Sequence, residues 1–132
     1  MPGLTVLLVD DEPHITHIVS RKLEGAGINT IIARDGEEGL RVAIDVVPDM
    51  VVTDLQMPRM TGFELASELR QNPATADIPV ILLTARGYFL SQKELEQTNI
   101  REVMSKPFTA RGLLDRVIDM TRDSDQDRRN AA

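Results

Sequence analysis

The fold is decided by one short stretch, Met50-Val51-Val52-Thr53-Asp54, which is apolar almost to its end and closes on a carboxylate. A short run without polar alternation is typical of a strand that is buried on both faces of a sheet. Burying a carboxylate without a partner is costly, so Asp54 is better explained by function than by stability. The stretch therefore predicts a core strand with a functional group at its carboxyl end.

Three further apolar runs end in the same manner, each on one or two polar groups. Residues 4–9 lead into Asp10 and Asp11, residues 80–83 into Thr84, and residues 103–105 into Lys106. Four strand-like runs that each end on a polar side chain indicate an active site built from strand ends.

Between these runs, apolar residues recur at helical spacing, and capping residues mark the helix starts. We expect strands at residues 4–9, 30–33, 50–54, 79–84 and 102–105. We expect helices that begin near Pro13, Asp35, Thr61 or Gly62, Ser91 and Thr109, and the fourth of these is a short helix that ends at Thr98. Such alternation predicts an α/β fold with a parallel sheet, helices on both faces, and all strands ending at one edge. The ligand crevice of these sheets lies at that edge, so the polar groups at the strand ends should converge.

Composition narrows the class of protein. The chain has 132 residues, no cysteine and a net charge of -6, from 15 basic and 21 acidic side chains. This balance argues against direct binding of nucleic acid or of an anionic membrane. No run reaches the ~20 apolar residues of a membrane span, and a cytoplasmic location is the expectation. We predict one domain over residues 1–122 and a polar, disordered tail over residues 123–132.

The converging groups suit phosphoryl chemistry. Two carboxylates about 4 Å apart repel by about 4 kcal/mol at an effective dielectric near 20, and a cation between them removes this repulsion. An all-oxygen ligand set with room for water and phosphate favours Mg²⁺. Beside such an ion, Asp54 is placed to attack a phosphoryl group, with Lys106 and Thr84 each meeting one phosphoryl oxygen.

Four motifs in this order resemble those of the receiver domains of bacterial two-component response regulators, in particular stand-alone chemotaxis regulators. They are Val9-Asp10-Asp11-Glu12, the run from Asp54 through Met57-Pro58 to Gly62, Leu83-Thr84-Ala85 and Ser105-Lys106-Pro107-Phe108. The resemblance extends over residues 4–122, which is nearly the whole chain.

The resemblance implies a flavodoxin-like (βα)5 fold, a three-layer sandwich around a five-stranded parallel sheet of order 2-1-3-4-5. It implies that Asp54 takes phosphate from the phosphohistidine of a histidine kinase or histidine phosphotransfer protein. Asp11, Asp54 and the backbone carbonyl of Gln56 would bind Mg²⁺ directly, and Asp10 largely through water. Thr84 would be the hydroxyl that moves toward the phosphate.

The resemblance also assigns modulating roles to residues around this site. Gln56 and Arg86 would tune the lifetime of the phosphate, and the bond between Lys106 and Pro107 would be cis. Val103 departs from the family pattern, because an aromatic residue is usual three positions before the lysine. We therefore hypothesise that Tyr88 or Phe89 supplies the mobile aromatic surface that reports phosphorylation.

Two other classes of protein share parts of this pattern. A haloacid-dehalogenase-type phosphatase also uses Asp, Thr, Lys and Mg²⁺, but its aspartates are separated by one residue, whereas Asp10 and Asp11 are adjacent. A flavin-binding module would need a phosphate loop rich in Ser, Thr and Gly after the first strand. His14 and His17, one turn apart, have no evident third nitrogen ligand and are interpreted as a solvated face.

The leading interpretation is a phosphoacceptor signalling domain that catalyses only its own phosphorylation and dephosphorylation. It would signal through contact with a downstream protein. A receiver that forms part of a longer regulator or of a hybrid kinase remains an alternative.

Overall fold

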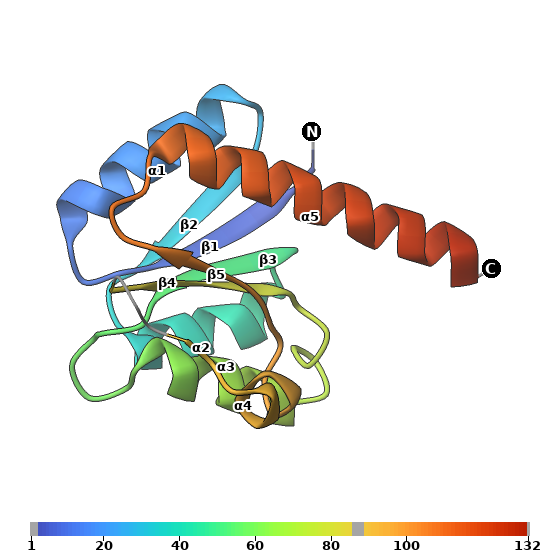
Figure 1. The fold of residues 1–132 in the computed structure, drawn as a ribbon. Coiled ribbons are helices and arrows are strands. Elements are labelled where there is room, and N and C mark those ends of the chain that lie inside the picture. The colour runs from blue at the N-terminus through green and yellow to red at the C-terminus, as the bar shows by residue number, and fades with distance from the viewer. Residues whose placement is uncertain (1–2, 86–88, 132) are drawn as a thin grey trace.

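In the computed structural model, the described part of the chain forms one five-stranded parallel sheet with helices on both faces (Figure 1). The structure describes residues 3–85 and 89–131, and their side chains as far as Arg122. The strand order is β2-β1-β3-β4-β5, which confirms the predicted order.

Strands and helices alternate along the chain. The strands are β1 (Thr5–Val9), β2 (Asn29–Ala33), β3 (Met50–Asp54), β4 (Val80–Thr84) and β5 (Ile100–Ser105). The helices are α1 (Pro13–Gly25), α2 (Gly36–Val46), α3 (Gly62–Gln71), α4 (Gln92–Glu96) and α5 (Ala110–Ala131).

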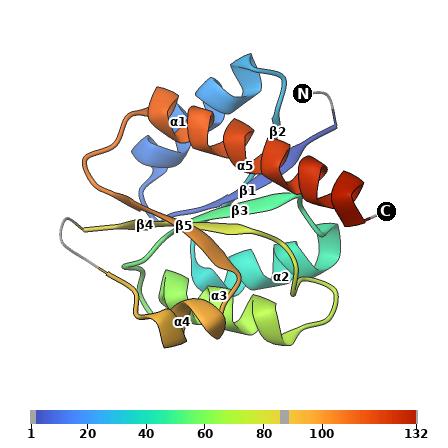
Figure 2. The ribbon, with the colours of Figure 1, turned by 45° about the vertical axis from the view of Figure 1, so that its right-hand side comes forward.

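The sheet separates two apolar layers. Figures 1 and 2 show α1 and α5 on one face and α2, α3 and α4 on the other. Successive strand residues point to opposite faces, so Val6 and Leu8 pack in the layer of α1 and α5, and Leu7 and Val9 in the opposite layer. Because both faces are covered, β3 and β4 are buried along their whole length.

Helix starts follow the expected capping chemistry. Pro13 is the first residue of α1, and the Asp35 side chain accepts a hydrogen bond from the Glu38 N–H at 2.8 Å. Thr61 forms a reciprocal capping box with Glu64, and Thr109 accepts a hydrogen bond from the Gly112 N–H at 2.9 Å. These helix starts were all predicted from the sequence.

β5 and α4 differ in length from the expectation. β5 begins at Ile100 instead of residue 102, because a register shift pairs Val80 with Ile100 and Ile81 with Glu102 and leaves Arg101 as an extra residue. α4 was expected over residues 91–98 but spans only Gln92–Glu96. Thr98 follows it, and its hydroxyl donates to the Glu94 carbonyl at 3.1 Å.

The last helix is longer than the sequence suggested. α5 continues to Ala131, whereas a disordered tail was expected from residue 123. The sequence after Gly112 holds no glycine or proline, the two residues that disfavour a helix most strongly. No helix in the described ranges is both long enough and apolar enough to cross a membrane.

Gly62 lies where the chain leaves the end of β3 and enters α3. Its N–H donates to the Leu55 carbonyl at 2.8 Å, and a Cβ at this position would collide with the Asp54 carbonyl oxygen and lie 2.9 Å from Leu82 Cδ1. The backbone therefore passes the strand end at a distance that only glycine permits.

We expect Gly62→Ala to lower the free energy of unfolding by about 1–3 kcal/mol, because an added methyl group must displace packed backbone. Urea denaturation measures the effect. The matched control is Gly25→Ala, since a Cβ at Gly25 meets nothing within 4 Å. Equal stability of the two variants would contradict the close approach.

Candidate functional site

The ends of β1 and β3 bring three carboxylates together. Asp10 and Asp11 follow β1 directly, and Asp54 is the last residue of β3, the strand that pairs with β1. One carboxylate oxygen from each lies within 4.8 Å of the others. Asp10 and Asp54 are buried, and Asp11 is exposed. The cluster is therefore buried at Asp10 and Asp54 and open to solvent at Asp11.

Among the residues that the structure describes, Lys106 supplies the positive charge nearest to Asp54. Its Nζ lies 3.2 Å from Asp54 Oδ1. The backbone N–H of Lys106 donates to the Thr84 carbonyl at 2.8 Å, so β4 fixes the point from which the lysine side chain extends. Burial raises the pKa of Asp54 and the charge of Asp11 adds to the rise, although Lys106 opposes it. Burial alone would lower the pKa of Lys106, but Asp54, together with the charges of Asp10 and Glu12, outweighs this effect and raises it.

The surroundings of Asp10 disfavour the charged form of its carboxyl group. Its Oδ1 accepts a hydrogen bond from the Glu12 N–H at 2.9 Å, but its buried Oδ2 has no hydrogen-bond partner among the described residues. Burial raises its pKa to about 6; the Glu12 N–H works against this rise, and the charge of Asp54 contributes to it. An unpartnered buried oxygen beside two other carboxylates fits a hard cation such as Mg²⁺, which prefers oxygen ligands.

Thr84 ends β4 next to this cluster. Its hydroxyl is fully buried and has no hydrogen-bond partner within residues 3–85 and 89–122. A buried hydroxyl without a partner costs about 1–3 kcal/mol, so its position is better explained by a ligand oxygen than by stability.

The remaining predicted residues lie around these groups. Gln56 is exposed in the loop after β3, and the bond between Lys106 and Pro107 is cis as expected. Val103 is half-buried on β5, opposite Leu82, and packs in the layer of α2 and α3.

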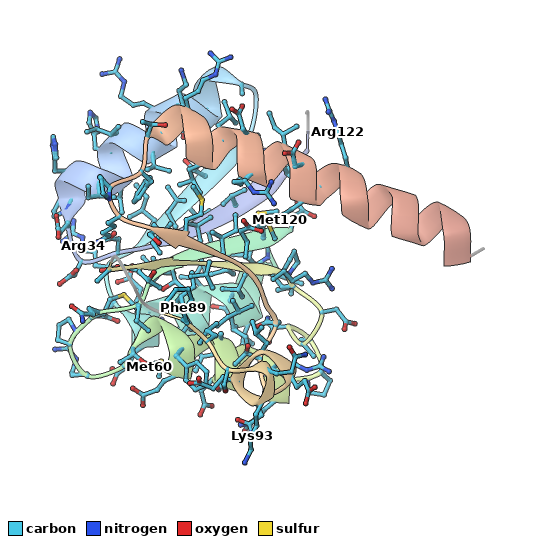
Figure 3. The ribbon with its side chains drawn as sticks, viewed as in Figure 1. Arg34, Met60, Phe89, Lys93, Met120 and Arg122 are labelled. Atoms are coloured by element: carbon cyan, nitrogen blue, oxygen red, sulfur yellow. The ribbon has the colours of Figure 1, made fainter. Side chains whose placement is uncertain are left out.

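Two of the residues singled out in the sequence, Arg86 and Tyr88, lie outside the described residues. Phe89 is 86% exposed, and in Figure 3 it lies toward the same end of the sheet as Arg34 and Met60.

Two features near the site escaped the sequence analysis. Arg59 Nη2 lies 3.2 Å from Asp35 Oδ2, although 24 residues separate them along the chain. No local pattern predicts an ion pair of this kind. The sequence did contain a signal for the close approach of Gly62 to Asp54. Glycine is a poor helix former, so its place directly after the helix-capping Thr61 calls for another reason.

Fold and site together define a receiver domain. The sequence model of the response regulator receiver domain matches residues 6–118, and the chain belongs to this family. The expected membership is confirmed, and the phosphatase and flavin-binding interpretations are left without support.

Relatives with this domain occur in different proteins. The chain is 36% identical over 121 residues to the DNA-binding dual master transcriptional regulator RpaA of Synechocystis, covering 92% of the chain and 50% of RpaA. It is 33% identical to hybrid signal transduction histidine kinase D of Dictyostelium discoideum, covering 87% of the chain and 7% of that kinase. The crystal structure of chemotaxis protein CheY4 of Vibrio cholerae superimposes with a TM-score of 0.80 at 31% identity, covering 88% of the chain and 97% of CheY4. The chain thus spans about half the length of RpaA.

The raised pKa of Asp10 predicts a pH-dependent stability for the metal-free protein. An unfolded Asp10 titrates near pH 3.9, whereas the folded group titrates at about 6, so the folded protein binds the proton more tightly between these values. Its contribution to stability is therefore lost as pH rises through this window.

Asp10→Asn removes this titration. We expect the variant to gain stability over the original protein as pH rises from 4 to 7, by about 3 kcal/mol at most for a shift of this size. Urea denaturation in the presence of a chelator, at several pH values, measures the difference. A difference that stays constant with pH would contradict the raised pKa.

Proposed function

We propose that Asp54 is the phosphoacceptor of this receiver domain. The observation that supports it best is the position of its carboxylate, 3.2 Å from Lys106 Nζ and within a cluster of two further carboxylates. In the proposed reaction, an oxygen of Asp54 bonds to the phosphorus of a phosphohistidine. The phosphorus–nitrogen bond breaks, and its electron pair stays on the imidazole nitrogen.

The neighbouring groups have separate roles in this proposal. Lys106 remains an ammonium and attracts one phosphoryl oxygen, and the unpartnered hydroxyl of Thr84 donates to another. Asp11 and Asp54, with the Gln56 carbonyl and with Asp10 through water, would hold Mg²⁺. When bound, this ion neutralises charge that develops on the phosphoryl oxygens.

The donor in this proposal is a histidine kinase or a histidine phosphotransfer protein, as the receiver family implies. The output is contact with a downstream protein. The net charge of -6 argues that the domain itself does not bind nucleic acid, even though RpaA is described as DNA-binding. Turnover would be limited to the domain's own phosphorylation and dephosphorylation.

Incubation with acetyl phosphate and Mg²⁺ tests the phosphoacceptor. We expect the intact mass to increase by one phosphoryl group, and Asp54→Asn to show no increase, because the amide is a much weaker nucleophile. Equal labelling of both proteins would place the nucleophile elsewhere. Continuous release of phosphate from small esters would instead indicate a phosphatase.

The metal site predicts a stabilisation by Mg²⁺. At a tenfold excess over its dissociation constant, the ion should raise the free energy of unfolding by about 1.4 kcal/mol, because it binds only the folded protein. Thermal unfolding with and without Mg²⁺ measures this effect. Asp11→Asn should weaken it, whereas Asp45→Asn, an exposed carboxylate near the end of α2, should not. A protein that Mg²⁺ leaves unchanged would contradict the site.

A further inference from the structure

The loop between β3 and α3, residues 55–61, carries the proposed metal ligand Gln56, and its two ends are firmly held. The Leu55 N–H donates to the Leu83 carbonyl at 2.9 Å, and the Gly62 N–H donates to the Leu55 carbonyl at 2.8 Å. Met57 is buried in the layer of α2 and α3. The outer part of the loop, in which Pro58 and Arg59 are exposed and Met60 is half-buried, needs separate support.

That support comes from the first turn of α2. Arg59 Nη2 lies 3.2 Å from Asp35 Oδ2, and a Cβ at Gly36 would lie 2.8 Å from Met60 Cβ, so Met60 packs directly over Gly36. We call these four residues, Asp35, Gly36, Arg59 and Met60, the loop anchor. Figure 3 shows Met60 on the side of the sheet that carries α2 and α3.

Arg59 adopts a backbone conformation that requires such support. Its φ is +70°, in the left-handed region that non-glycine residues seldom occupy, and this strain persists only when surrounding contacts fix the chain. The Met60 N–H donates to the Pro58 carbonyl at 2.8 Å, which closes a tight turn around Arg59. The turn is therefore stabilised on both sides of the strained residue.

Asp35 is a well-fixed partner for Arg59. Its Oδ1 caps α2 by accepting from the Glu38 N–H at 2.8 Å, which leaves Oδ2 for the guanidinium. The Glu38 N–H, together with Arg59, lowers the pKa of Asp35, so its carboxylate is charged near neutral pH. A side chain bound through one oxygen to its own helix cannot follow the loop if the loop moves.

We propose that Arg59 is a positioning residue for the metal site, and that its ion pair with Asp35 holds the Gln56 backbone in place for Mg²⁺. This inference rests on the proposed function, because it assumes that the carboxylate cluster binds the ion. The start of α2 would then influence the affinity for Mg²⁺. It would do so through Arg59, because none of the ion pairs of the described residues joins α2 to a proposed metal ligand.

The dissociation constant of Mg²⁺, measured by isothermal titration calorimetry, distinguishes this role from a purely electrostatic one. Arg59→Gln removes a positive charge near a cation site, so through-space electrostatics alone would strengthen Mg²⁺ binding. Loss of the loop anchor would weaken it. We expect a two- to fivefold higher dissociation constant, and any strengthening or an unchanged value would overturn the proposal.

Further variants isolate the ion pair. Asp35→Asn keeps the helix cap, because asparagine caps as well as aspartate, but it removes the charge; it should weaken binding to the same extent as Arg59→Gln. The double variant should be no weaker than either single one. Arg59→Lys retains the charge and should bind Mg²⁺ more tightly than Arg59→Gln; a loss equal to that of Arg59→Gln would overturn the ion pair as the cause.

The matched control is Arg41→Gln, which removes an exposed positive charge from α2 outside the loop anchor and should leave the dissociation constant unchanged or lower it. If the original protein does not bind Mg²⁺ at all, the metal site of the proposed function fails and the positioning role falls with it. If the original protein binds Mg²⁺ and all variants bind equally, only the positioning role is overturned.

Discussion

Repulsion among three carboxylates at the carboxyl edge of the sheet is the constraint on which this structure depends. Asp10, Asp11 and Asp54 approach within 4.8 Å, and two of them are buried. Such a cluster lowers the stability of the metal-free fold, and the charge of Lys106 offsets part of this cost at Asp54 and at Asp10, whose pKa values stay raised nonetheless. The free energy gained by packing the two apolar layers must therefore exceed the repulsion among these carboxylates, which contributes nothing to the stability of the fold.

A parallel sheet is well suited to maintain this arrangement. The central strands β1, β3 and β4 are covered on both faces, so their backbones are fixed by packing over their full length. The functional groups stand at the ends of these rigid strands, where the chain turns outward and the side chains meet solvent and ligand. A site on rigid strands keeps unfavourable charges at a fixed spacing, which a site on loops would allow to relax.

The sequence predicted those features that depend on local chemistry. Strand order followed from the resemblance, and the convergence of Asp54, Thr84 and Lys106 followed from polar residues at strand ends. The start of β5 was missed because the register of β5 against β4 shifts at Arg101, and such a shift depends on the pairing of the strands, not on the residue itself. The ion pair between Arg59 and Asp35 was missed for the same reason, since it joins the loop after β3 to the start of α2, which only the folded chain brings together.

The small size of the Coulomb energy at this distance favours a geometric over an electrostatic role for Arg59. A unit charge 10 Å from another contributes about 0.4 kcal/mol in a water-like dielectric, and salt at physiological strength screens it further over a Debye length of about 8 Å. Arg59 is 62% exposed, so its field at the carboxylate cluster is largely screened. Its backbone, by contrast, lies three residues from Gln56 in a strained conformation, and a change there moves the chain directly. Coupling through the backbone is therefore the stronger route from α2 to the metal site.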